Sequence, residues 1–301
     1  MEPILIAGAG RVAQAMGRLL AEHGEPVFAV AGRDPGRTAA AAAFIGHRVK
    51  PVALTTLPKR TARILVAVTD NAISEIAQRL AEQGMQRSIA LHTCGALGAE
   101  VLAPLASAGV SCGALHPLQT FATPEQGLSV LPGCLFAIDG DPAALAWAEQ
   151  IARLLGGETL RIPAQSRLVY HAAAVMASNY VVALVDAAAM LMDAAGVGQE
   201  RALRAIGPLV EASVSNALHL GPVEALTGPI QRGDLLTLRG HMQALAGAPE
   251  SVRELYRWAG LHALGIAVRR GLPRERALLV EELLREGEGG NAGYGQARSG
   301  A

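Results

Sequence analysis

The sequence predicts an α/β protein in two parts: an N-terminal doubly wound, mostly parallel sheet, followed by an all-α C-terminal domain. Up to about residue 164, short apolar or β-branched runs alternate with helical patterns, as in a doubly wound sheet. Between residues 165 and 286 only helical patterns remain. At 301 residues the chain is also long for one compact domain, so two domains are expected.

The first turn indicates which kind of doubly wound sheet this is. An apolar run at residues 4–7 ends in Gly8-x-Gly10-x-x-Ala13, and apolar residues then recur at helical spacing. Gly8 lets the chain leave a strand sharply, Gly10 leaves room for a pyrophosphate, and Ala13 lets a helix lie close to the strand. The N–H groups at the helix start would face the phosphates. This Rossmann pattern predicts that the cofactor is bound by Gly8, Ala9, Gly10, Arg11, Val12 and Ala13. A tight turn without a ligand is the alternative.

The second strand, predicted at residues 26–31, decides which dinucleotide is expected. An enzyme that uses NAD would place an acidic residue about twenty residues after the glycines, on the ribose 2′-OH. Here that corner carries Arg33, and a guanidinium can bind a 2′-phosphate through two parallel hydrogen bonds. Arg11 and Arg37 would add positive charge. The sequence therefore predicts NADP, with a solvated Arg33 and a helix-capping Asp34 as the alternative.

The next strands bring further residues to the same edge of the sheet. A strand at residues 63–68 leads into Thr69 and Asp70, and a strand at residues 88–92 leads into Thr93 and Cys94. Because ligands bind beyond the carboxyl ends of parallel strands, these four residues are expected beside the cofactor. Asp70 is equally well explained as a helix N-cap.

The remaining elements complete both parts. Further strands are predicted at residues 110–116, 135–138 and 158–162, with a helix at residues 142–155 between the last two. Helices are predicted at residues 166–195, 199–218, 235–245, 249–269 and 273–285, before a glycine-rich, disordered tail at residues 287–301. The alanine-rich helices offer more apolar surface than one small bundle needs, so a homodimer through this domain is expected.

Composition excludes several classes of function. The chain has 26 basic and 26 acidic residues and 3% aromatic residues, and it has no basic run, which argues against nucleic acid or membrane surfaces as partners. Its three cysteines form no Cys-x-x-Cys pair, and no basic region precedes the first apolar run, so a cytoplasmic protein is expected. The uncharged stretch between Arg167 and Asp186 has nearly the length of a membrane span, but its alanines and polar residues favour a helix buried in protein.

Three motifs together resemble a known family. They are Leu91-His-Thr-Cys-Gly-Ala-Leu97, His116-Pro-Leu-Gln-Thr-Phe121 and Leu226-Thr-Gly-Pro-Ile-Gln-Arg-Gly-Asp234. With them the chain resembles a bacterial family of Rossmann-like proteins with a helical C-terminal domain of unknown function. That family looks like a branch of the superfamily of 6-phosphogluconate dehydrogenase, prephenate dehydrogenase, ketopantoate reductase and pyrroline-5-carboxylate reductase. The resemblance implies an NADP-dependent oxidoreductase acting on a small molecule, and it names no substrate.

The resemblance also bears on individual residues. The Leu115-His116-Pro117 element is similar to a His-Pro element of prephenate dehydrogenases, whose histidine lies at the nicotinamide and contacts the reacting oxygen. Hydroxyacid and ketopantoate enzymes carry a Lys four residues before an Asn on the first long helix. Asn179 matches that Asn, but Val175 stands where the Lys would be. The lysine acid–base group of those enzymes is therefore missing here.

The candidate catalytic residues are His116, Asn179 and His241. Hydride transfer to C=O or C=N requires a proton, and an imidazole such as His116 titrates near working pH. Asn179 would orient substrate or nicotinamide, and His241 or His171 would reach the cleft from the helical domain; a packing role is the alternative for each histidine. A zinc set of His92, Cys94, Cys112 and His116 lacks any usual ligand spacing, so no metal is expected.

Two functions remain open at this point. The first is an NADP(H)-dependent reductase in which His116 donates the proton or holds the oxygen. The second is a non-catalytic NADP-binding sensor or assembly protein, which the missing lysine favours. Fold alone does not decide between them.

Overall fold

The computed structural model describes residues 2–55 and 63–286. It divides into two compact units after Ser178. The predicted division was at residue 164, so the helix α7 (Arg167–Ala177) belongs to the first unit instead of the helical one. The tail predicted at residues 287–301 lies outside the described residues.

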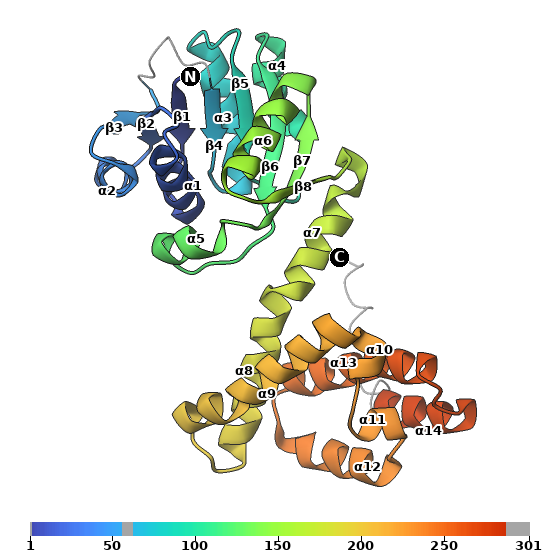
Figure 1. Ribbon diagram of the computed structural model, residues 1–301. Coiled ribbons are helices and arrows are strands. Elements are labelled where there is room, and N and C mark those ends of the chain that lie inside the picture. The colour runs from blue at the N-terminus through green and yellow to red at the C-terminus, as the bar shows by residue number, and fades with distance from the viewer. Residues whose placement is uncertain (1, 56–62, 287–301) are drawn as a thin grey trace, which may run out of the picture. The chain divides into compact units, whose positions relative to one another are not determined.

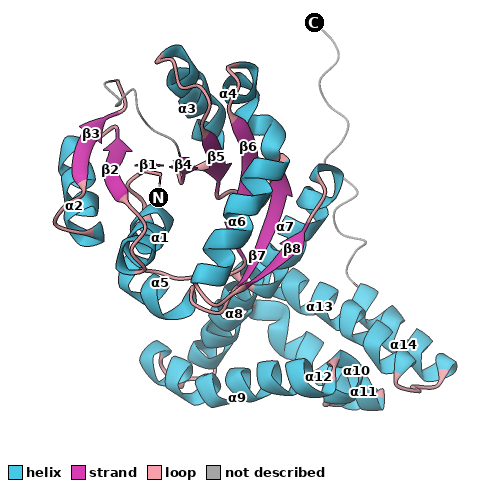
Figure 2. Ribbon diagram, turned by 45° about the horizontal axis from the view of Figure 1, so that its top comes forward, coloured by secondary structure: helices cyan, strands magenta, loops and turns pink. Residues whose placement is uncertain are grey.

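The first unit contains a sheet of eight described strands with helices on both faces (Figures 1 and 2). The strands are β1 Ile4–Ala7, β2 Val27–Gly32, β3 Lys50–Ala53, β4 Arg63–Val66, β5 Ile89–His92, β6 Ser111–Pro117, β7 Leu135–Gly140 and β8 Glu158–Arg161. The other helices of this unit are α1 Arg11–Glu22, α2 Pro35–Ile45, α3 Asp70–Glu82, α4 Ala103–Ser107, α5 Pro124–Val130 and α6 Pro142–Leu154, with 3-10 turns at Ala99–Leu102 and Ala164–Ser166.

The strand order is β3-β2-β1-β4-β5-β6-β7-β8. Neighbouring strands pair parallel except β6 and β7, which pair antiparallel. From β1 the chain builds outward through β2 and β3, then returns to β4 and builds in the other direction. The reversal leaves a crevice between β1 and β4 at their carboxyl ends, where doubly wound sheets bind ligands. The predicted fold class is confirmed.

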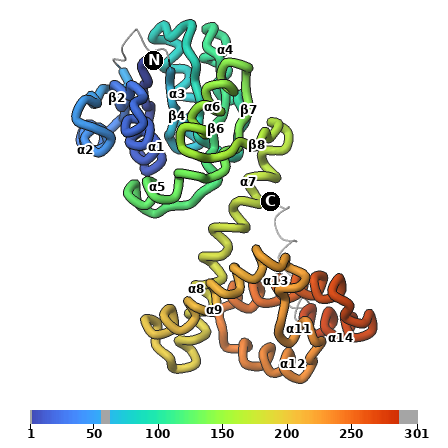
Figure 3. The backbone as a smooth tube through the Cα atoms, viewed as in Figure 1, coloured from blue at the N-terminus to red at the C-terminus, as the bar shows by residue number. Residues whose placement is uncertain are grey.

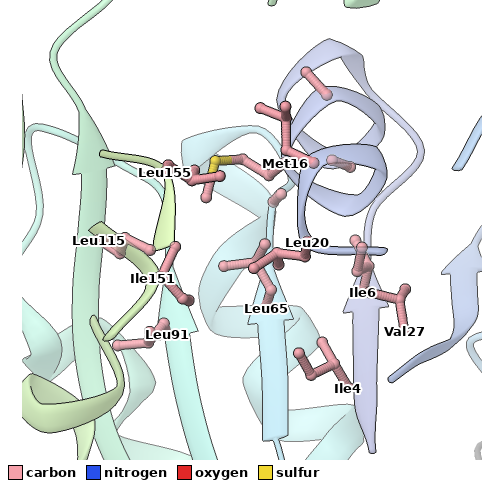
Figure 4. Close-up of a cluster of buried hydrophobic side chains, with 14 of the residues drawn as sticks. Ile4, Ile6, Met16, Leu20, Val27, Leu65, Leu91, Leu115, Ile151 and Leu155 are labelled. Atoms are coloured by element: carbon pink, nitrogen blue, oxygen red, sulfur yellow. The ribbon is translucent and has the colours of Figure 1, made fainter. Parts of the chain in front are cut away.

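Alternating side chains of the strands explain the two faces. Ile4 and Ile6 pack beneath α1, α2 and α6, and Figure 4 shows this cluster with Met16, Leu20 and Ile151. Leu5 and the other strand residues whose side chains lie on the opposite face of the sheet pack against α3 and α4. Because both faces are covered, the central strands are continuous apolar runs instead of alternating ones.

Two elements of this unit were absent from the sequence prediction. The strand β3 (Lys50–Ala53) is largely exposed and contains Pro51, so it lacks the apolar signal of a buried strand. The helix α5 (Pro124–Val130) is short and begins with Thr123 as N-cap, whose side chain accepts from the Gln126 N–H. It contacts α1, as the tube in Figure 3 shows.

The second unit is helical throughout its described residues. Its helices are α8 Asn179–Ala194, α9 Gln199–Leu220, α10 Pro222–Ala225, α11 Pro229–Arg232, α12 Leu235–Ala244, α13 Glu250–Arg269 and α14 Arg274–Arg285, with a 3-10 turn at Leu245–Gly247. Leu238, Leu264 and Val280 centre a small core between α12, α13 and α14. In the 226–234 motif, Asp234 caps α12 by accepting from the Thr237 N–H at 3.1 Å, so this part of the motif is explained by local structure.

The helix predicted at residues 166–195 is interrupted at Ser178, where φ is −125° and ψ is −73°. The Ser178 hydroxyl donates to the carbonyl oxygen of Ala174 at 2.7 Å, a bond to the preceding turn that often bends helices. The segment Ala164–Ala194 is the one described stretch long and apolar enough to cross a membrane, with a mean hydropathy of 1.7. Only 11% of its apolar 18-residue window is buried, so the expected helix buried in protein is not what the described residues show. One such helix is weak evidence for a membrane span.

His92 holds the loop that follows β5. Its side chain is fully buried, its Nδ1 accepts from the Cys94 N–H at 3.2 Å, and its Nε2 lies 3.0 Å from the carbonyl oxygen of Gly98. Because Nδ1 is an acceptor, the proton lies on Nε2. Burial lowers the pKa of His92 to about 4, so this histidine is neutral at pH 7. The histidine therefore fixes residues 93–98 at the carboxyl edge of the sheet.

This bonding predicts how stability depends on pH. In the unfolded chain His92 takes up a proton near the ordinary histidine pKa of 6.5, whereas the folded state resists protonation until about pH 4. His92 therefore contributes stability above pH 6.5 that is lost as the pH falls toward 4. Between pH 7 and pH 5 the wild type should lose about 2 kcal/mol that His92→Gln does not lose. Urea unfolding at both pH values measures this, with the exposed His47→Gln as control. Equal losses in wild type and His92→Gln would show that folded His92 protonates freely.

Candidate functional site

A cavity of about 480 Å³ lies at the carboxyl ends of β1, β2 and β4. Its lining includes Gly8, Ala9, Gly10, Arg11, Val12, Arg33, Arg37, Thr69 and Thr93. Gly8 makes the turn possible: its φ is +129°, and a Cβ there would lie 2.1 Å from the carbonyl oxygen of Ala67 at the end of β4. No residue with a side chain fits at this position, so Gly8 is required by the close approach of two strands.

The N-terminus of α1 opens into this cavity. Gly10 is its N-cap residue, and no side chain among the described residues caps the helix, so the N–H groups of the first turn are free for a ligand. A Cβ on Gly10 would meet no described atom within 4 Å, which leaves the backbone open to the cavity. Free N–H groups and an open backbone are what the diphosphate of a dinucleotide requires, so these residues fit that cofactor.

Two cations stand at the end of β2. Arg33 and Arg37 are exposed, line the cavity, and have no side-chain partner among the described residues. Asp34 accepts from the Arg37 N–H at 2.7 Å and caps α2, as the alternative interpretation of this corner expected. Arg11 lines the same cavity but donates to the carbonyl oxygens of Phe121 and Ala122, at 3.4 and 3.2 Å. Among the described residues of this corner, Arg33 and Arg37 are therefore the cations whose side chains remain available to a ligand.

Three predicted cofactor residues do not line the cavity. Ala13 is fully buried and packs inside the core beneath α1. Asp70 is an exposed residue in the first turn of α3, and Thr69 instead of Asp70 occupies the N-cap position. The Cys94 thiol is buried, and burial raises its pKa to about 11. Cys94 is therefore an unreactive thiol at neutral pH.

A second group of polar side chains gathers around His116, at the carboxyl end of β6. Nδ1 of His116 lies 2.9 Å from the hydroxyl of Tyr170 on α7, and the two rings meet edge to face. The His171 ring lies 6.1 Å from the His116 ring, centroid to centroid. Both imidazoles pack on Gly95, where a Cβ would lie 2.8 Å from His116 Nε2 and from His171 Nδ1. Gly95 follows Thr93 by two residues, and Thr93 lines the cavity at the ends of β1, β2 and β4. One short loop therefore joins this cluster to that cavity.

The electrostatics of His116 differ from the sequence expectation. Burial, and then the nearby His171 and Arg167, lower the pKa of His116 to about 4. The imidazole is therefore neutral at pH 7 and does not titrate near working pH, as had been expected. A neutral imidazole still offers one N–H donor and one acceptor nitrogen.

Arg167 is a functional candidate that the sequence analysis missed. Its side chain is fully buried, its Nε lies 3.8 Å from a carboxylate oxygen of Asp139, and its Nη1 donates to the carbonyl oxygen of Cys94 at 3.5 Å. Nε and Nη2 have no hydrogen-bond partner among the described residues, and burial lowers the pKa of this guanidinium. The spacing in the sequence could have indicated this cluster. Arg167, Tyr170 and His171 occupy positions i, i+3 and i+4, which lie on one face of a helix.

Asn179 and His241 belong to the second unit. Asn179 is the first residue of α8, and His241 lies in the last turn of α12. Nδ1 of His241 lies 2.8 Å from the hydroxyl of Tyr256, so this histidine has the same kind of partner as His116. Their catalytic roles stay predictions.

Several side chains of the conceivable zinc set make other contacts. Both ring nitrogens of His92 are bonded to the backbone, and Cys112 contacts carbonyl oxygens of Val110 and Leu102. Within residues 2–55 and 63–286, no three His, Cys, Asp or Glu residues cluster closely enough to hold a metal ion. The three cysteines are free and buried.

Two protein families match separate regions of the chain. Residues 3–117 match the family known as the Rossmann-like domain, and residues 134–263 match the domain of unknown function DUF2520. None of the curated proteins matches the chain.

Solved structures share the fold at low sequence identity. A protein of Bacteroides fragilis with the provisional name NADP oxidoreductase is 22% identical, with a TM-score of 0.74, and the match covers 88% of this chain and 98% of that one. A reductive aminase of Aspergillus terreus, in complex with NADPH, is 17% identical with a TM-score of 0.56 over 96% of both chains. A Plasmodium falciparum pyrroline carboxylate reductase with NADP bound is 12% identical, with a TM-score of 0.58 over 94% of this chain and 98% of that one.

At these low sequence identities, the solved structures show that the fold is shared. They do not show the activity of this chain. The chain therefore combines a region similar to a Rossmann-like domain with a region similar to DUF2520, and it shares its fold with these solved structures.

Proposed function

We propose that this protein is an NADP(H)-dependent oxidoreductase that transfers a hydride to or from a small C=O or C=N substrate. The cavity lined by Gly8, Gly10 and Arg33 is here called the cradle, because it would hold the dinucleotide. The observation that carries the proposal is the short loop from Thr93 to Gly95, which joins this cradle to the polar cluster around His116. A cradle alone would suit a sensor. A cradle beside a half-buried imidazole, a phenol and a buried guanidinium suits a reaction that moves a proton as well as a hydride.

Each part of the chain has a distinct task in this proposal. The N–H groups of α1 and the open backbone at Gly10 bind the diphosphate, and Arg33 with Arg37 binds the 2′-phosphate. NADPH supplies the hydride. His116 contacts the substrate heteroatom and provides a hydrogen bond where charge develops. Asn179 and His241 remain candidates for orienting the substrate from the second unit.

The rival function, a non-catalytic NADP-binding protein, is separated from this one by a direct experiment. NADPH absorbance is followed with a panel of keto acids, aldehydes and cyclic imines, alongside NADPH affinity by calorimetry. Turnover of a panel member supports the oxidoreductase, whereas tight NADPH binding without any turnover supports the sensor.

The first prediction from this proposal concerns cofactor choice. Arg33→Ala should weaken NADPH binding by about ten-fold or more, which corresponds to roughly 1.5–3 kcal/mol, and leave NADH binding unchanged. The reason is that only NADPH carries the 2′-phosphate that the guanidinium would bind. Arg48→Ala is a matched control, because Arg48 is exposed and lines a different cavity of the same unit. Equal weakening of both cofactors would show that Arg33 does not read the 2′-phosphate.

The second prediction concerns His116. His116→Asn should keep NADPH affinity within about two-fold but lower kcat about a hundred-fold, because Asn keeps a donor and cannot pass a proton on. Since the pKa of His116 is lowered to about 4, wild-type kcat should be flat from pH 6 to pH 9. The exposed His47→Asn serves as control. Unchanged kcat in His116→Asn would reduce His116 to a packing residue, and an inflection near pH 6.5 that His116→Asn abolishes would show that His116 titrates there.

The third prediction concerns assembly. We propose a homodimer through α8 and α9, because their apolar side chains stay exposed: Val182 is 69% exposed and Leu218 is 79% exposed. Light scattering should give twice the chain mass at micromolar concentration, and Val182→Asp should shift it toward the monomer. Leu236→Asp, on α12 and 85% exposed, should not. A monomeric wild type would contradict this assembly.

A further inference from the structure

The hydrogen bond between Tyr170 and His116 joins the two matched regions of the chain. His116 lies in the Rossmann-like region at residues 3–117, and Tyr170 lies in the DUF2520 region at residues 134–263. The 2.9 Å distance between Nδ1 and the hydroxyl allows either atom to carry the shared hydrogen. Which atom carries it decides what His116 offers on its other nitrogen.

Donor strength decides the direction. A phenol is a better donor than acceptor, and the lone pair of a neutral imidazole is a strong acceptor. Within the described residues the Tyr170 hydroxyl has no other hydrogen-bond partner, so its hydrogen has no competing acceptor. The nearby Arg167 cation favours electron density on the phenol oxygen and so polarises this O–H further. The hydroxyl therefore donates to Nδ1, and the imidazole proton lies on Nε2.

Both groups are in the protonation states that this arrangement needs. Burial lowers the pKa of His116 to about 4 and raises the pKa of Tyr170 to about 12, so the imidazole is neutral and the phenol is protonated at pH 7. The charged and titratable groups that act on His116 are His171 and Arg167 on α7, His92 at the end of β5 and Asp70 at the start of α3. Asp139 on β7 pairs with Arg167 at 3.8 Å.

We propose that Tyr170 is a positioning residue: its hydroxyl holds His116 in the neutral Nε2–H form and replaces the proton that His116 gives to an alkoxide oxygen. This inference rests on the proposed oxidoreductase function. In the reduction of a carbonyl, hydride adds to carbon and the C=O π pair moves to oxygen. The alkoxide takes the Nε2 proton, Nδ1 takes the Tyr170 proton, and the negative charge resides on the phenol oxygen near Arg167. Nε2 then takes up a proton from solvent while Nδ1 returns its proton to the phenolate oxygen, so the Nε2–H imidazole and the neutral phenol are restored. The reaction consumes the carbonyl compound, NADPH and one solvent proton, and the products are an alcohol and NADP⁺.

The arrangement favours one of the two substrate classes. A carbonyl gains negative charge on oxygen during reduction, and a neutral N–H donor with a cation behind it stabilises that charge. A protonated imine enters as a cation and needs no further proton after hydride arrives. The buried Arg167 disfavours a second cation nearby. The substrate class is therefore a ketone or aldehyde, or the corresponding alcohol in the reverse direction.

The first arm of the test reads the tautomer without any substrate. ¹⁵N NMR of the full-length protein at pH 7, with His116 assigned by its loss in His116→Asn, should show the proton of His116 on Nε2. Tyr170→Phe should convert this signal into a mixture of tautomers. Tyr256→Phe is the matched control, because it removes the same hydroxyl from the 2.8 Å pair with His241 and should leave the His116 signals unchanged. A wild-type proton on Nδ1, or the same tautomer population in Tyr170→Phe, overturns the proposal.

The second arm reads the relay. With a carbonyl substrate from the panel, Tyr170→Phe should lower kcat by about ten-fold or more while KM and NADPH affinity stay within about two-fold. A change in KM alone, or an unchanged kcat, overturns the relay. Turnover of imines but not of ketones or aldehydes overturns the substrate class. If the wild type turns over no panel member, the oxidoreductase proposal fails, and the NMR arm still decides whether Tyr170 sets the tautomer.

Discussion

The close approach of the first turn to the end of β4 is the constraint on which the cradle depends. Gly8 passes so near the carbonyl of Ala67 that no side chain fits between them. This contact lets β1 and β4 lie side by side at the point where the strand order reverses, with the N-terminus of α1 above the crevice. Any residue larger than glycine would separate the two strands and displace the helix whose N-terminus opens into the cavity.

The charged and titratable groups at the two ends of the crevice differ in their exposure to solvent. At the end of β2, Arg33 and Arg37 remain exposed and uncommitted, as is needed to attract an anionic group from water. Around β5 and β6 the imidazole of His92 is buried and that of His116 is half-buried. Burial, and to a smaller degree the nearby Arg167 cation, lowers the pKa of each, so both are neutral at pH 7. Desolvation explains the difference, because a buried histidine loses its proton more readily than an exposed one. In the proposed function, affinity for a phosphate and control of a proton are thus separated along one sheet edge.

The helix α7 contributes side chains to the His116 cluster, although it belongs to the helical part of the sequence. It packs with the sheet unit although its composition resembles the helices that follow. Its first turns carry Arg167, Tyr170 and His171 toward the ends of β5 and β6, while Leu168 and Val169 stay exposed on its other side. The DUF2520 region therefore contributes side chains to the His116 cluster from within the first unit.

The sequence by itself determined the features that depend on neighbouring residues. The strand–helix alternation, the glycine turn and the helical half follow from periodicity and backbone freedom, which are local properties. The strand β3 lacked an apolar signal, and the helix predicted at residues 166–195 is interrupted at Ser178, whose hydroxyl donates to the preceding turn. Tertiary structure alone decided the pairing of His116 with Tyr170 and the burial of Arg167. Tyr170 lies far from His116 in the chain, and the pKa of His116 depends on desolvation, which exists only once β5, β6 and α7 have packed together.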